Sequence, residues 1–145
     1  MFGLLLGYTT ITSKFGKRVA PTSGASTYHS GIDIAAPTGS NLVAIFSGKV
    51  TYSGFQGAGG YTITIENAPY KVSYCHVSPD FIVYVGQNIK KGQTIGMVGP
   101  KNVYGIIGNP YKDSSGNPTN GATTGPHLHL TLKKDGTNVD PLEYL

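Results

Sequence analysis

The 145-residue chain has no tryptophan and a single cysteine, and only 12% of its residues are charged. One cysteine cannot form an internal disulfide, so a hydrophobic core has to hold the fold together. A chain of this length can bury such a core in one domain. No apolar run approaches the roughly 20 residues that cross a bilayer. We therefore expect one domain over residues 1–145 and no membrane span.

The sequence also lacks the marks of a secretory leader. The opening segment MFGLLLGY has no basic residue before its apolar stretch, and that stretch is short for a signal peptide. If the protein acts outside the cell, we expect it to be carried there on a virion or as a domain of a larger exported protein.

Acidic residues are scarce, since seven Asp and Glu oppose eleven Lys and Arg, which leaves a formal net charge of +4. This balance favours weak attraction to anionic surfaces, including nucleic acid and a cell wall that bears teichoic acid. Nucleic-acid binding is typically accompanied by clustered Lys and Arg with interleaved aromatics, and the sequence has no such cluster. We expect an ordinary basic surface and no nucleic-acid partner.

Glycine, proline and tyrosine are plentiful, with 21, 9 and 10 residues, and turn-forming residues separate short runs of Val, Ile and Thr. This pattern is typical of an all-β fold, and long 3.6-residue periodicity is missing, so we expect at most a single helical turn at 79–82. The predicted architecture is a barrel-like antiparallel sandwich. Its expected strands lie near residues 8–12, 30–35, 42–52, 61–66, 70–77, 93–98 and 127–133.

Three loops rich in small and turn-forming residues lie at 20–28, 54–60 and 100–125. The last is long for a compact domain, which indicates either a functional or a mobile segment. Because binding residues tend to collect on loops, we expect these loops to wall a groove above the sheet.

All four histidines lie in strand-like segments. In GPHLHL, leucines alternate with His127 and His129, so both rings share the face away from the apolar residues. In HSGID, His29 and Asp33 share a face in the same way. Two such strands could offer three nitrogen and oxygen ligands to Zn²⁺ and leave a position open for water, as in catalytic zinc sites. Manganese or iron in a cupin-like barrel is also compatible with these ligand types.

The remaining histidine, His76, follows the only cysteine in YKVSYCHVS. Strict alternation places His76 on the same face as Val72 and Tyr74, and Cys75 on the opposite face. We interpret Cys75 as a small core residue and not as a nucleophile.

Six segments follow one another along the chain: SKFGKR (13–18), HSGID (29–33), YCH (74–76), IKKGQTIGMVG (89–99), TGPHLHL (124–130) and VDPLEYL (139–145). In this order they resemble the lysostaphin-type (LytM-like) zinc endopeptidases, which cleave the peptide part of bacterial peptidoglycan. The resemblance covers essentially the whole chain, and TGPHLH is strongly characteristic. A domain without a leader also resembles the lytic domains of bacteriophage tail proteins.

The resemblance implies one Zn²⁺ per chain, with His29, Asp33 and His129 as its ligands. It implies that His127 and His76 are the catalytic histidines that do not bind the metal. The implied substrate is a peptidoglycan peptide, in a cross-link or a stem peptide, and the implied place of action is the cell wall. His127 is the better candidate for the general base, because it lies two residues from a ligand on the same face.

The chain departs from the family pattern in two places. Family members often have an active-site tyrosine upstream of the first ligand, whereas Tyr28 directly adjoins His29 and alternation turns it towards the core. The segment 100–125 is longer than the usual linker before TGPHLH, so substrate preference cannot be carried over. Arg18 has either a supporting role near the site or a structural one.

Two other functions compete with hydrolysis. A degenerate domain of the same fold could bind the wall or activate a partner hydrolase, but such domains usually lose ligands. The segments GKVTYSG and IKKGQTIGMVG also resemble the hairpins of glucose-type phosphocarriers and biotinyl carriers. Neither carrier class predicts HSGID together with TGPHLH.

Overall fold

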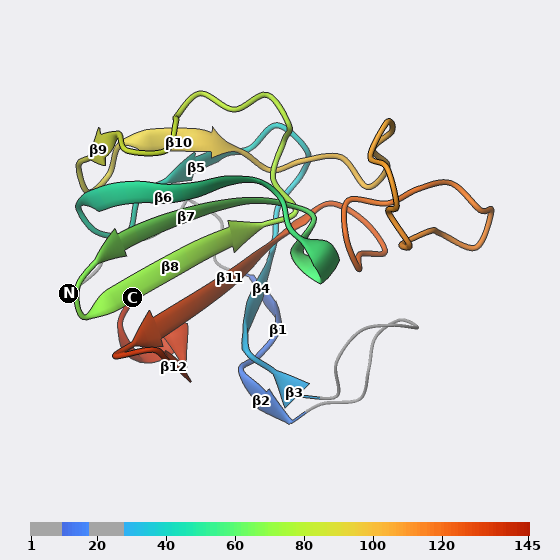
Figure 1. Ribbon diagram of the computed structural model, residues 1–145. Coiled ribbons are helices and arrows are strands. Elements are labelled where there is room, and N and C mark those ends of the chain that lie inside the picture. Colours follow the sequence, from blue (N-terminus) through green and yellow to red (C-terminus); the bar gives the residue numbers. More distant parts are fainter. Residues whose placement is uncertain (1–9, 18–27) are drawn as a thin grey trace.

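A computed structural model of the protein, which describes residues 10–17 and 28–145, has two layers of strands (Figure 1). The main sheet runs in the order β1-β4-β11-β8-β7-β6-β9, and all neighbouring strands are antiparallel. Its strands are β1 (Ile11–Ser13), β4 (Gly31–Ala35), β6 (Gly48–Phe55), β7 (Tyr61–Asn67), β8 (Tyr70–Cys75), β9 (Asn88–Ile89) and β11 (His127–Lys134). A further strand, β12 (Thr137–Val139), also pairs with β11.

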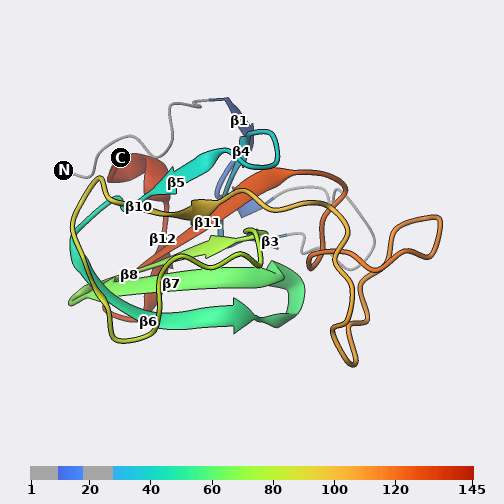
Figure 2. The same ribbon diagram turned by 90° about the horizontal axis from the view of Figure 1, so that it is seen from above.

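Two short strand pairs complete the fold. β5 (Asn41–Val43) pairs with β10 (Thr94–Met97) and packs against one face of the main sheet (Figure 2). The buried Tyr74 joins these layers, because its hydroxyl accepts a hydrogen bond from the N–H of Ile45 and donates one to the carbonyl of Val43. β2 (Gly16–Lys17) pairs with β3 (Tyr28–His29) beside the edge of the main sheet.

Alternation along the strands of the main sheet separates the core from an open face. On β11, Leu128, Leu130 and Leu132 are fully buried in the core between the layers. His127 and His129 point to the other face, where they line a groove of about 1250 Å³. The sequence pattern therefore predicted correctly which face of this strand is available for chemistry.

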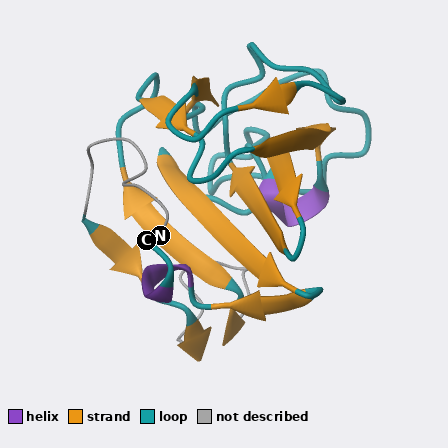
Figure 3. Cartoon of the chain, turned by 90° about the vertical axis from the view of Figure 1, so that its left-hand side faces the viewer, coloured by secondary structure: helices purple, strands orange, loops and turns teal. Residues whose placement is uncertain are grey.

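The expected all-β class is confirmed. Among the described residues the helical segments are the 3₁₀ turns η1 (Gly57–Gly59) and η2 (Pro141–Glu143) (Figure 3), and the turn expected at 79–82 does not form. No helix in the described ranges is long and apolar enough to cross a membrane.

One expected strand, 42–52, is wrong because the chain there forms two strands, β5 and β6, separated by a bend. Ile45 and Phe46 turn into the core at this bend, and the N–H of Ile45 bonds to the Tyr74 hydroxyl instead of a neighbouring strand. Residues 8 and 9 of the expected first strand lie outside the described residues, and β1 begins at Ile11.

Candidate metal centre

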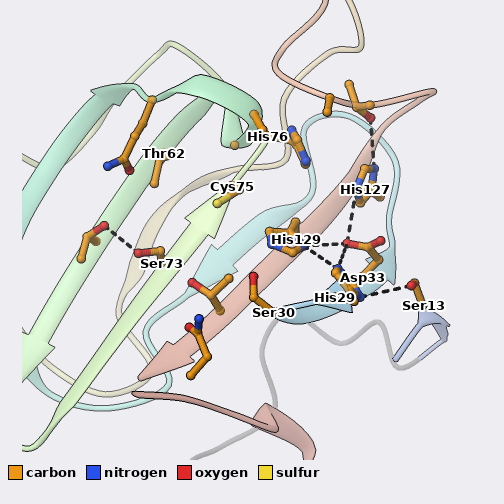
Figure 4. A pocket seen from close by; sticks show the side chains of 18 of the residues that line it. Ser13, His29, Ser30, Asp33, Thr62, Ser73, Cys75, His76, His127 and His129 are labelled. Carbon is orange, nitrogen blue, oxygen red and sulfur yellow. Dashed lines mark hydrogen bonds and ion pairs between the residues drawn. The ribbon is translucent and has the colours of Figure 1, made fainter. Parts of the chain in front are cut away.

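Three side chains from neighbouring strands converge at one end of the groove (Figure 4). Nε2 of His29 lies 2.9 Å from Nδ1 of His129 and 3.4 Å from Oδ1 of Asp33. Nδ1 of His129 lies 2.9 Å from the same carboxylate oxygen. Two imidazole nitrogens and a carboxylate oxygen thus lie within 3.4 Å of one another, and this donor set could hold a divalent metal ion.

Strand pairing explains why these residues meet. β4 and β11 run antiparallel with Asp33 directly opposite His129, so their side chains leave the sheet side by side. His29 is the last residue of β3, separated from β4 by Ser30 alone, and reaches the same point from the edge. The HSGID and HLH segments are far apart in sequence, and a single register brings them together.

Contacts around the ring fix the orientation of His29. Its Nδ1 lies 3.1 Å from the main-chain carbonyl of Lys14 and 3.1 Å from the hydroxyl of Ser13. A carbonyl can only accept, so Nδ1 carries the proton, and the unprotonated Nε2 faces Asp33 and His129, where its lone pair is free for a metal ion. A metal-ligating histidine typically has its second nitrogen held in this way.

The carboxyl of Asp33 is held in its ionised form. Burial on its own raises the pKa of Asp33, but the close imidazoles of His127, His129 and His29 outweigh it and place the pKa well below its usual range. Burial has the opposite effect on His129, whose pKa is lowered so that the neutral ring is favoured. An ionised carboxylate and neutral imidazoles are the protonation states that bind a metal.

His127 lies beside the ligand cluster and has its own support. Its Nδ1 is 2.9 Å from the carbonyl of Gly125 and 3.2 Å from the hydroxyl of Thr123. Since the carbonyl accepts the Nδ1 proton, Nε2 is the basic nitrogen, and it lies 3.5 Å from Oδ1 of Asp33.

His76 lies next to His127, with ring centroids 4.7 Å apart. Its Nδ1 is 2.6 Å from the main-chain carbonyl of Asn120, which again leaves Nε2 as the basic nitrogen. Burial, together with the nearby His127, lowers the pKa of His76 to about 3, so the ring is neutral at physiological pH. All four histidines therefore gather at the same end of the groove (Figure 4).

Two expectations about β8 were wrong. The strand ends at Cys75, because His76 adopts a left-handed backbone conformation with φ of 61° that few non-glycine residues adopt. This twist turns His76 to the groove, so it lines the same face as Cys75, while Val77 enters the core. Cys75 is buried, and burial raises the pKa of its thiol to about 11, which agrees with an unreactive cysteine.

The long loop contributes less to the groove than expected. Its last residues, 122–125, line the groove, whereas the segment 103–118 projects away from the main sheet (Figure 1). Its base is closed by a hydrogen bond from the N–H of Val103 to the carbonyl of Pro118. The 54–60 loop does supply residues to the groove wall. Of the 20–28 loop, residues 20–27 lie outside the described residues.

The sequence analysis missed the residues that support the histidines. Asn120, Thr123 and Ser13 hold His76, His127 and His29 respectively, through main-chain or side-chain atoms. Asn, Thr and Ser are ordinary loop residues, so no pattern in one sequence distinguishes these three. Arg18 and the side chain of Tyr28 lie outside the described residues.

Residues 27–141 match the family model described as Peptidase family M23. Over 138 residues the chain is 33% identical to the DD-carboxypeptidase/endopeptidase Mpg of Neisseria meningitidis, covering 94% of this chain and 27% of that protein. It is 31% identical to the murein hydrolase activator NlpD of Escherichia coli, over 88% of this chain and 29% of the relative. The chain thus spans little more than a quarter of the length of these relatives.

Solved structures give a consistent result. A zinc-containing peptidase from Vibrio cholerae superposes with a TM-score of 0.70 at 32% identity, covering 92% of this chain and 36% of the other. The catalytic domain of lysostaphin from Staphylococcus simulans superposes with a TM-score of 0.72 at 26% identity, covering 94% and 91%. The likeness to this catalytic domain extends over nearly all of both chains.

Proposed function

This chain belongs to peptidase family M23, and from that premise we propose that it is a zinc-dependent endopeptidase of bacterial peptidoglycan. Its substrates are peptide bonds in cross-links or stem peptides. The observation that carries this proposal is the convergence of His29, Asp33 and His129 beside two histidines that the ligand cluster does not use. The proposal treats residues 1–145 as one peptidase domain.

In this proposal His29, Asp33 and His129 hold one Zn²⁺ through Nε2, a carboxylate oxygen and Nδ1. The donor set fits zinc, because catalytic zinc sites combine three nitrogen or oxygen ligands with one open position. When bound, the ion lowers the pKa of a coordinated water to about 7 and polarises the substrate carbonyl.

His127 is the general base of the proposed reaction. Its Nδ1 proton is engaged by the Gly125 carbonyl, so Nε2 is available to accept the proton of the attacking water. The same nitrogen then returns a proton to the leaving amine as the peptide bond breaks. Thr123 holds the ring during both transfers, since its hydroxyl contacts Nδ1.

His76 orients the attacking water. The neutral ring, with its Nδ1 proton on the Asn120 carbonyl, offers only the Nε2 lone pair to the groove. It therefore accepts a hydrogen bond and directs the water's remaining lone pair towards the carbonyl carbon. A stabilising contact to the developing oxyanion requires His76 to take up a second proton first.

A second candidate function is that of a non-catalytic wall-binding domain or hydrolase activator, which the similarity to NlpD favours. The presence of three ligand residues together with both His127 and His76 supports the hydrolase instead. The two functions differ in one readout, because only the hydrolase releases peptides from purified wall.

The proposed substrate lies outside the cytoplasmic membrane. We accordingly place the site of action at the cell wall, reached either on a bacteriophage virion as part of a tail protein or within a larger exported wall hydrolase. The wall peptide is the proposed partner.

Metal analysis of matched variants tests the ligand assignment. The wild-type protein is expected to carry about one zinc per chain, and His129→Ala to lose it. The control is His127→Ala, which removes an imidazole on the same strand face and is expected to retain the metal. A full equivalent of zinc in His129→Ala would refute the ligand set.

A further inference from the structure

The groove extends well beyond the candidate metal centre, along the open face of β11, β8 and β7. Antiparallel pairing arranges the groove-facing side chains in rows that cross the strands. Three of the pairs between β11 and β8 face the groove. Starting at the metal centre, they are His129 with Cys75, Thr131 with Ser73, and Lys133 with Lys71.

The middle row is a line of hydroxyl groups. Ser73 lies opposite Thr131 on one side and Thr64 on the other. The hydroxyls of Ser73 and Thr64 are 2.8 Å apart, and both residues line the groove. Hydroxyl groups can donate and accept, so this row suits the main chain of a bound peptide and carries no charge preference.

The far row is charged. Lys133 and Lys71 lie directly opposite each other on neighbouring strands. Glu66 faces Lys71 from β7, and Lys49 faces Glu66 from β6, so the row carries net positive charge. Within the described residues, neither Lys71 nor Lys133 has a hydrogen bond or ion pair to a protein side chain.

Like charges directly opposite in a sheet are destabilising, so the Lys71–Lys133 pair does not itself stabilise the sheet, although Glu66 opposite Lys71 offsets part of the repulsion. Both lysines line the groove, and Asn138 of β12 lies on the other side of Lys133. Two ammonium groups beside an amide form a site suited to a carboxylate, with Lys71 and Lys133 supplying charge and Asn138 a further donor.

We propose that Lys71 and Lys133 form a subsite that binds a free carboxylate of the peptide substrate, about three to four residues from the scissile bond. Lys133 follows His129 by four residues on one strand, a rise of about 13 Å. An extended peptide advances about 3.3–3.6 Å per residue, which sets the spacing. This inference rests on the proposed function, because it assumes that the scissile bond lies at the metal centre.

Equilibrium binding of a matched peptide pair tests this subsite. A fluorescently labelled synthetic stem-peptide dimer is used with its carboxylates free and with the same groups amidated, in the His127→Ala background to prevent turnover. The test protein carries Lys71→Met and Lys133→Met. The control carries Lys134→Met, which removes one positive charge from the residue of β11 next to Lys133, outside the groove lining.

We expect amidation to weaken binding about 3- to 10-fold in the parent and in the Lys134→Met control. The double variant should bind both peptides equally, and added salt should shrink the parent's preference. A parent that binds both peptides alike, or a double variant that keeps the preference, would overturn the subsite. Failure of the wild-type protein to hydrolyse the peptide would instead refute the proposed function, and this binding result would be unaffected.

Discussion

The imidazole Nδ1 of His76 lies 2.6 Å from the main-chain carbonyl oxygen of Asn120, and this contact ties the candidate catalytic residues to the end of the long loop. Asn120 is completely buried. Its side chain accepts a hydrogen bond from the N–H of Tyr61 and donates one to the carbonyl of Val77. Its main-chain N–H donates to the main-chain carbonyl of Lys101. The loop therefore ends in a rigid support for His76.

Asn120→Ala should reduce kcat more than it reduces zinc content. The substitution leaves the N–H of Tyr61 and the buried carbonyl of Val77 without a side-chain partner, and the loss at the carbonyl alone costs about 1–3 kcal/mol. His76 then loses its fixed position, whereas the ligand cluster rests on other strands. Hydrolysis rates, metal analysis and thermal unfolding measure the three effects separately.

The control for this prediction is Asn102→Ala, which breaks side-chain hydrogen bonds to Asp113 and Pro118 in the projecting part of the loop. It should leave kcat nearly unchanged. Equal losses of kcat in both variants would mean that Asn120 does not position His76.

His127→Ala should lower kcat by about 100- to 10,000-fold, the usual contribution of a general acid–base group, while zinc is retained. His76→Asn should have a smaller effect, because asparagine keeps a donor for the Asn120 carbonyl and tolerates the left-handed backbone at this position. Hydrolysis of a synthetic cross-linked peptide provides the rates. Near-wild-type turnover by His127→Ala would remove it from the mechanism.

The metal-free protein should lose stability in acid. Burial lowers the pKa of His76 to about 3 in the folded state, whereas an unfolded histidine titrates near 6.5. Between these values the unfolded chain binds the extra proton, so the free energy of unfolding falls as the pH falls from about 6.5 to about 3. Each pKa unit corresponds to about 1.4 kcal/mol.

Denaturant titrations in the presence of a chelator, from pH 7 to pH 4, measure this dependence. His76→Asn lacks the titrating group and should show a shallower loss of stability. Parallel curves for the two proteins would show that His76 takes up its proton equally well in both states.

Replacement of residues 104–117 by a short Gly/Ser linker should leave cleavage of short peptides within about twofold of wild type. The segment lies outside the groove lining, and Val103 and Pro118 already meet at its base. Longer loops add little to the closure cost, so stability should change only modestly. The replacement must end before Asn120, because a deletion that includes it would also remove the support of His76. A large fall in short-peptide kcat, with Asn120 intact, would give the projecting segment a role in catalysis.

Alternating patterns predicted the all-β fold, the core leucines of β11 and the shared face of His127 and His129. These are local properties of a strand, which the sheet preserves. The meeting of HSGID and HLH depends on the register between β4 and β11, which alternation within either segment does not specify. The position of His76 could not be predicted, since a single left-handed residue reverses the alternation. Asn120 could not be identified either, because its importance arises from contacts with residues more than 40 positions away.

Mass spectrometry of fragments released from purified peptidoglycan distinguishes peptide-bond hydrolysis from glycan cleavage and from binding without hydrolysis. We expect the zinc-loaded protein to release peptide fragments with new amino and carboxyl termini and to leave the glycan strands intact. Chelator-treated protein should release none, and His127→Ala should release fragments at least about 100-fold more slowly. Release of no fragments by the zinc-loaded protein, or of fragments cut only in the glycan, would contradict the proposed function.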